Sequence, residues 1–155
     1  MSCSVPLFCL LCFVAAPPKA ECLEADFVGT WELQSIEVKG GNGEWTAARM
    51  PEDDQRPVGV LMYDDKGNMA VQITTEPRHV ETPEDNPEVI HGYVAYYGKY
   101  NVDAKAGTIT HRRQNHINPS IGKLDVVRYF QFSGDILTLS PAPQKTMRLK
   151  WKRIR

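Results

Sequence analysis

The sequence is poor in cysteine, and most of its cysteines lie near its start. Of the 4 cysteines in the 155 residues, Cys3, Cys9 and Cys12 come first, and only Cys22 follows them. A domain formed by residues 21–155 would have no second thiol for an internal disulfide, which excludes the small disulfide-stabilised folds. The Cys9-x-x-Cys12 spacing lies in an apolar leader rather than at the start of a helix, so it predicts no redox site.

An excess of charge of one sign is also missing. The chain has 18 basic and 19 acidic residues, for a formal net charge of −1. Nucleic-acid binding needs a broad cationic surface, and the only basic stretch, at 145–155, is short. We therefore expect no nucleic-acid partner.

Long apolar runs are absent except at residues 5–16, which read VPLFCLLCFVAA. This run has the length of a secretory signal core and falls short of the ~20 residues that a membrane-spanning helix needs. We predict a signal peptide over residues 1–20, cleaved after Ala20, and a secreted single domain over 21–155 with no membrane insertion. The alternative is a cytoplasmic protein with an uncleaved apolar N-terminus, because no Lys or Arg precedes the run and Pro18 is unfavourable before a cleavage point.

Standard catalytic and metal-binding motifs are missing as well. The sequence contains no nucleophile elbow, no phosphate-binding loop and no dinucleotide fingerprint. His111 and His116 are five positions apart, which places them on opposite faces of a strand, and no cysteine cluster accompanies His79 or His91. We predict neither a metal site nor a cofactor.

The main pattern in the sequence is an alternation of apolar and polar residues with a period of two. From residue 27 onward apolar and polar residues mostly alternate, and turn residues interrupt them about every ten positions, as in an antiparallel meander. The stretch 75–93 breaks this pattern with three prolines, and it predicts a long loop with a short helix near 87–93. The predicted strands are 28–39, 58–63, 69–74, 96–102, 108–117, 124–132, 136–140 and 147–154.

Eight short strands joined by turns predict an all-β fold, an eight-stranded up-and-down antiparallel β-barrel. An open sheet would leave two exposed edges, which closure removes. A two-sheet sandwich is the alternative, but the nearly uninterrupted hairpin connections favour the barrel. A barrel of eight strands has room for its own side chains or for one small ligand.

An ordered set of short segments resembles the lipocalin-like domain family, whose members include stand-alone bacterial and fungal proteins of this length. The resemblance covers about residues 27–154 and begins with Gly29-Thr30-Trp31, similar to the lipocalin Gly-x-Trp signature. It implies a calycin-type barrel in which Trp31 closes one end and a basic residue of the last strand, Arg153 or Arg148, packs on its ring. The other segments are Gly59–Tyr63, Gly67–Gln72, Tyr97–Tyr100, Thr110-His111, Val127–Phe130 and Leu149–Trp151.

Polar residues that share the inward face of predicted strands mark the candidate site. In strand 108–117, His111, Arg113 and Asn115 alternate with their neighbours in step with the apolar Ile109. We therefore expect them to share the inner face with it. Arg128 shares a face with Phe130, so it needs a counter-charge, either an acidic ligand group or Glu37. The ligand-binding candidates are Tyr63, Gln72, Tyr96, Tyr100, His111, Arg113, Arg128 and Phe130, and the structural candidates are Gly29, Trp31 and Arg153.

Each of these residues also has a purely structural interpretation. Arg128 could form an internal ion pair or face outward, His111 could be a satisfied interior hydrogen-bonding group, and the tyrosines could be core aromatics. Gln72 could orient a ligand or only line the wall.

Two functions are compatible with this pattern. The first is a binding module for a small lipophilic or aromatic organic molecule. The second is a cofactor-independent isomerase or cyclase in the biosynthesis of polyketide- or terpenoid-like secondary metabolites, with His111 as the catalytic acid or base. A role in binding a protein partner through the 75–92 loop has no specific support.

Overall fold

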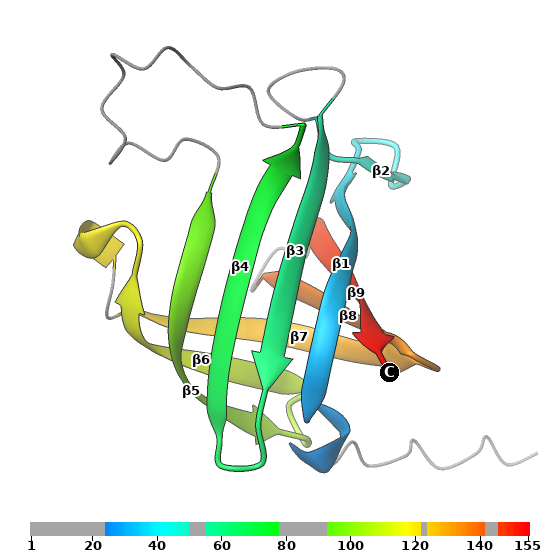
Figure 1. Ribbon diagram of the computed structural model, residues 1–155. Coiled ribbons are helices and arrows are strands. Elements are labelled where there is room, and N and C mark those ends of the chain that lie inside the picture. The colour runs from blue at the N-terminus through cyan, green and yellow to red at the C-terminus, as the bar shows by residue number, and fades with distance from the viewer. Residues whose placement is uncertain (1–23, 50–54, 78–92, 122–123, 142–145) are drawn as a thin grey trace, which may run out of the picture.

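The structure is a computed structural model of the chain, and it describes residues 24–49, 55–77, 93–121, 124–141 and 146–155. Strands form nearly all of this part (Figure 1). The elements in chain order are η1 (Glu24–Asp26), β1 (Gly29–Lys39), β2 (Trp45–Ala47), β3 (Arg56–Tyr63), β4 (Asn68–Glu76), β5 (Val94–Asp103), β6 (Thr108–His116), η2 (Pro119–Ile121), β7 (Asp125–Ser133), β8 (Ile136–Pro141) and β9 (Met147–Ile154).

The strands form a closed antiparallel barrel, as the turn spacing predicts. β3 to β9 pair with one another in chain order, and β1 pairs with both β3 and β9, which closes the ring. The alternative of a two-sheet sandwich is wrong. Closure satisfies the backbone groups that two free sheet edges would leave unpaired.

One strand of the fold was not predicted from the sequence. The short strand β2 pairs with the second half of β1, in the registers Glu37↔Ala47 and Lys39↔Trp45, and it adds a ninth strand beside the barrel. The helix expected near 87–93 and the signal peptide expected at 1–20 fall outside the described residues. Within the described part, no helix has the length and apolar character needed to cross a membrane.

One end of the barrel is filled by aromatic side chains. Trp31 and Phe27 are both fully buried, and the Trp31 indole N–H donates a hydrogen bond to the Phe27 carbonyl oxygen at 2.9 Å. The Phe27 ring meets Phe130 and Phe132 edge-on, each at a centroid distance of 5.0 Å. The helix η1 lies at the end of the barrel at which β1 begins (Figure 1), and the burial of Trp31 and Phe27 shows that this end is sealed.

A cation on Trp31 completes the seal. The Arg153 guanidinium lies 4.1 Å from the centre of the Trp31 ring, and it donates hydrogen bonds to the carbonyl oxygens of Val28 (2.6 Å) and Asp26 (2.5 Å). A contact of this kind contributes on the order of 1 kcal/mol. The sequence left Arg153 and Arg148 open for this role, and Arg148 instead lies over the ring of Trp45 at 4.2 Å.

Gly29 is required by the same contact. Its φ is +140°, a conformation that residues with a Cβ rarely adopt, and a Cβ at this position would lie 2.7 Å from an Arg153 guanidinium nitrogen. The first residue of the Gly-x-Trp segment is therefore glycine for both a backbone and a packing reason.

The other end of the barrel is open to solvent. Inward-facing residues near the sealed end, such as Leu61 and Ile109, are fully or almost fully buried. At the opposite rim, Val38, Met147 and Val94 also take inward register positions, yet they are 37%, 36% and 39% exposed. In the part of the chain that the structure describes, inward side chains at this rim therefore contact solvent, whereas those at the sealed end do not.

We expect Gly29→Ala to lower the free energy of unfolding by about 2 kcal/mol or more, because it combines an unfavourable φ with displacement of Arg153. Urea denaturation measures this change. Gly41→Ala is the matched control, since a Cβ there meets nothing within 4 Å, and it should change stability by less than about 0.5 kcal/mol. Equal effects of the two substitutions would contradict the assigned role of Gly29.

Candidate functional site

At the centre of the barrel a histidine is held between two phenols. The hydroxyl of Tyr63 on β3 lies 2.7 Å from His111 Nε2, and that of Tyr96 on β5 lies 3.0 Å from His111 Nδ1. His111, on β6, is only 2% exposed and is the buried polar side chain of the described core. Three strands thus converge on one hydrogen-bonded chain, Tyr63–His111–Tyr96, below called the central chain.

The central chain is uncharged. Burial lowers the pKa of His111 to about 3, with smaller contributions from the charges of Arg128 and Arg113. Burial also raises the pKa of Tyr63 well above its usual value and raises that of Tyr96. At neutral pH the imidazole therefore carries one N–H and one acceptor nitrogen, and both phenols are protonated.

The central chain has one more donor hydrogen than it has hydrogen bonds. Two O–H groups and one imidazole N–H supply three hydrogens, whereas the chain contains two hydrogen bonds. One phenol must accept the imidazole N–H, so its own hydroxyl hydrogen remains available. Within the described residues neither phenol has a further hydrogen-bond partner.

A β-bulge in β6 shapes the site and overturns one sequence interpretation. The register runs from Gly98↔Arg113 to Tyr97↔Asn115 and skips Gln114, which shifts every later residue to the other face. His116 therefore shares the inner face with His111 and stacks on Tyr96 at a centroid distance of 5.7 Å. The expectation that the two histidines lie on opposite faces is wrong, and so is the inward placement of Asn115.

Gly98 permits this bulge. A Cβ at Gly98 would lie 2.1 Å from the carbonyl oxygen of Arg112, so no other residue fits while the two strands stay this close. Arg113 is the register partner of Gly98. Its guanidinium lies 5.5 Å from the centre of the Tyr96 ring, and its Nε–H donates a hydrogen bond to the Leu124 carbonyl oxygen at 2.6 Å.

Arg128 lies on the inner face of β7, as its alternation with Phe130 predicts. It pairs in register with Ile109, which is fully buried, and it is itself only partly exposed. Burial lowers its pKa. Its one hydrogen bond in the described structure goes to the carbonyl oxygen of Val127, at 3.1 Å.

The carboxylate suggested as a partner for Arg128 is engaged elsewhere. Glu37 accepts from Arg148 Nε at 2.6 Å and pairs with Lys150 Nζ at 2.9 Å, on the outer side of β1 and β9. Burial alone would raise the Glu37 pKa, but the hydrogen bonds from Lys150, Arg148 and Ser35 together outweigh it and hold this pKa below its usual value. Among the described residues no carboxylate pairs with Arg128.

The remaining candidates divide between the sealed end and the outer surface. Tyr100 is 4% exposed and donates to the Asp64 carbonyl oxygen at 2.9 Å, and Phe130 packs on Phe27, so both belong to the sealed end. Gln72 is exposed on the outer face and lies apart from the central chain, because its neighbours Val71 and Ile73 in β4 take the inner positions.

The sequence did not lead us to expect one buried polar group, the indole N–H of Trp151. Trp151 is 1% exposed, and its indole N–H has no acceptor among the described residues. It lies between Leu33 of β1 and Leu137 of β8 in the sheet. The alternation Leu149, Trp151, Arg153 could have assigned it to the inner face, since Arg153 was already expected there.

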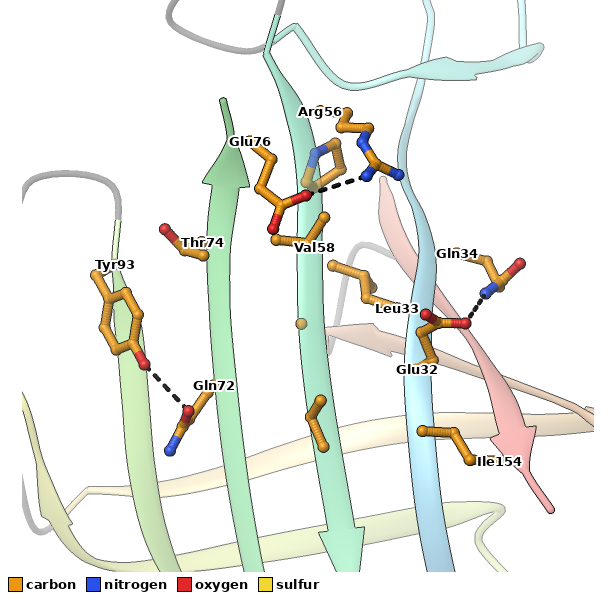
Figure 2. Close-up of a pocket in the computed structure, with 13 residues that line it drawn as sticks. Glu32, Leu33, Gln34, Arg56, Val58, Gln72, Thr74, Glu76, Tyr93 and Ile154 are labelled. Atoms are coloured by element: carbon orange, nitrogen blue, oxygen red, sulfur yellow. Dashed lines mark hydrogen bonds and ion pairs between the residues drawn. The ribbon is translucent and has the colours of Figure 1, made fainter. Parts of the chain in front are cut away.

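A hollow of about 650 Å³ lies on the outer side of the barrel wall, and Gln72 is one of the residues that line it (Figure 2). It begins where β1 and β3 stop pairing, beyond Glu32↔Val60. Its rim carries the ion pair Arg56–Glu76 at 3.0 Å and the hydrogen bond from the Tyr93 hydroxyl to Gln72 Oε1 at 3.1 Å. In the described ranges, no group of three or more metal-ligating side chains occurs here or in the interior.

Comparison with known proteins adds one positive finding. A family model described as a lipocalin-like domain matches residues 28–154, which covers all the described strands and leaves out the short helix η1 and Arg155. No curated protein matches the chain.

The burial of His111 predicts a specific acid sensitivity. The unfolded chain takes up a proton near pH 6.5 and the folded one only near pH 3, so acid favours the unfolded state within this window. The contribution of the neutral His111 side chain to the free energy of unfolding is complete above pH 6.5. It is lost as the pH falls, by about 1.4 kcal/mol per pH unit.

Denaturant unfolding at several pH values between about 4 and 7 measures this slope. In His111→Gln this slope should be shallower than in the wild type, because about one proton fewer is taken up on unfolding. His116→Gln is the comparison variant: burial also lowers the pKa of His116, but this imidazole is more exposed, so its removal should change the slope less than His111→Gln does. A wild-type slope that His111→Gln does not alter would show that folding leaves the protonation of His111 unchanged, and would contradict its lowered pKa.

Proposed function

The chain belongs to the lipocalin-like domain family, and from this premise we propose that it binds a small lipophilic or aromatic organic molecule inside the barrel. The observation that carries the proposal is the spare hydroxyl hydrogen of the central chain, which lies in the barrel interior. Buried donors without acceptors are costly, whereas a bound ligand can supply the missing acceptor.

Access and lining support the same proposal. The interior opens to solvent at the rim of Val38, Val94 and Met147, opposite the end that Trp31 seals. Between the rim and the central chain the wall includes Ile36, Ile73 and Leu149, which are apolar and partly exposed. Apolar walls with a few converging polar groups are typical of small-molecule sites.

Catalysis by the same residues is the second candidate, as a cofactor-independent isomerase or cyclase. The observation in its favour is that His111 contacts two phenols, which could pass a proton between a substrate and the imidazole. General bases work best with a pKa near the working pH, and a pKa of about 3 makes His111 a weak base. Binding is therefore the first proposal.

Export of the domain also remains a proposal. The apolar run at 5–16 and the start of the first described strand at Gly29 support removal of residues 1–20 before or during folding. Expression with the native N-terminus in a secreting host should yield exported protein that begins at Glu21, as N-terminal sequencing can determine. Full-length protein retained in the cytoplasm would refute this.

Titration with an uncharged fluorescent probe, N-phenyl-1-naphthylamine, tests the binding site. We expect saturable fluorescence enhancement with the wild type. Ile73→Trp should weaken binding at least about tenfold, because the larger side chain occupies interior volume on the inner face beside Val94.

Gln131→Trp is the matched control, since Gln131 is exposed on the outer face of β7, and it should bind the probe as the wild type does. Circular dichroism of both variants checks that the barrel is retained. No saturable binding by the wild type, or equal loss in both variants, would refute an interior site.

A further inference from the structure

The barrel interior is electropositive in its described part. Arg113 and Arg128 both take inward register positions, on the neighbouring strands β6 and β7. A third inward arginine, Arg153, is satisfied by the Trp31 ring and two carbonyl oxygens at the sealed end. Arg113 and Arg128 each have only a backbone carbonyl as hydrogen-bond acceptor within the described residues.

Acidic side chains are excluded from this interior. The described barrel strands contain five acidic residues, and each lies on an outward position or beside an outer partner. Glu32 is exposed opposite Val60, Glu76 pairs with Arg56, and Glu37 pairs with Arg148 and Lys150. Asp103 and Asp125 are exposed at strand ends. No carboxylate of these strands therefore compensates the two inward guanidinium groups.

Arg128 lies near the central chain, because it is two positions along the inner face of β7 from Val126, the register partner of His111. Its positive charge acts on both Tyr63 and Tyr96, and it lowers the pKa of His111 together with Arg113. The guanidinium also has most of its N–H donors unused, because it is bonded only to the Val127 carbonyl oxygen. An unpaired, partly buried cation is unfavourable, and an anion that contacts it removes this cost.

We propose that the barrel selects ligands with an ionised oxygen group, a carboxylate or an acidic phenol, which binds between Arg128 and the spare hydroxyl of the Tyr63–His111–Tyr96 chain. This inference rests on the proposed function and names its ligand class, an organic acid with a lipophilic or aromatic body. The apolar wall at Ile36, Ile73 and Leu149 receives the body, and the polar centre receives the acid.

The geometry of donors suits this class. A guanidinium offers paired N–H groups to two oxygens of a carboxylate, and a phenol O–H adds a third donor from β3 or β5. An uncharged amide or ether of the same shape would leave the Arg128 charge uncompensated. The inference is therefore one about charge selectivity rather than about affinity alone.

Calorimetric titration with matched probes tests the selectivity. One pair is 2-naphthoate and 2-naphthamide, and the other is 4-nitrophenolate and 4-nitroanisole, at a pH that ionises the phenol. The wild type should bind the acid of at least one pair about tenfold or more tightly than its neutral partner, as charge-assisted hydrogen bonds predict. Which pair shows the difference identifies carboxylates or phenolates as the preferred class.

Arg128→Met should abolish that preference while leaving affinity for the neutral probe within about twofold, and Arg128→Lys should retain part of it. The control is Arg112→Met, which removes an exposed, outward arginine from β6 and should keep the wild-type preference. The melting temperature provides a second measurement, because removal of an unpaired cation should leave it unchanged or raise it.

The outcomes separate this inference from the proposed function. If the wild type binds neither N-phenyl-1-naphthylamine nor any of the four probes, the interior site itself is refuted, whereas binding of N-phenyl-1-naphthylamine without binding of either acid refutes only the inferred ligand class. If acids and neutral partners bind equally well, or if Arg128→Met leaves the preference intact, only the charge selectivity is refuted. A lowered melting temperature of Arg128→Met with equal loss of both probes would show that Arg128 is structural.

Discussion

The structure depends on the pairing of β1 with β9, which joins the two ends of the sheet. Without it, eight strands would form an open sheet with two unpaired edges and an apolar face in water. The pairing places Trp31 directly opposite Arg153, and the cation on the indole ring holds η1 through the carbonyl oxygens of Asp26 and Val28. Closure and sealing of one end thus result from a single set of contacts between the first and last strands.

Because one end is sealed, polar groups in the interior have few ways to be satisfied. His111 solves this locally through two phenols, and burial keeps all three groups uncharged. Arg128 and the Trp151 indole N–H have no such solution within the described residues. Most buried polar groups in proteins are hydrogen-bonded, so exceptions in a chamber open at one rim favour a ligand-binding function over a purely structural one.

The bulge at Gln114 shows how a local irregularity changes a site. A regular β6 would direct His116 outward, and Tyr96 would lose the ring that stacks on it. Gly98 allows the close approach of β5 and β6 that the bulge requires. Bulges often re-aim side chains beside functional sites, and here the result is that two histidines and Arg113 share the chamber wall.

Sequence by itself determined the number and order of the eight main strands and the closed barrel, because alternation and turn residues are local signals. The Gly29-Thr30-Trp31 segment placed Trp31 at a closed end, while the structure chose Arg153 over Arg148 as the cation on its ring. The sequence also placed Tyr63, Tyr96, His111 and Arg128 inward, since parity within one strand needs no knowledge of its neighbours. Only the tertiary structure decided which of them meet, that Arg148 and Glu37 pair outside, that Gln72 faces outward and that Trp151 has an unpaired N–H. These features depend on the pairing register, on the residue skipped at the bulge and on distances between strands that are far apart in the sequence. The alternation of apolar and polar residues within one strand carries no information about any of them.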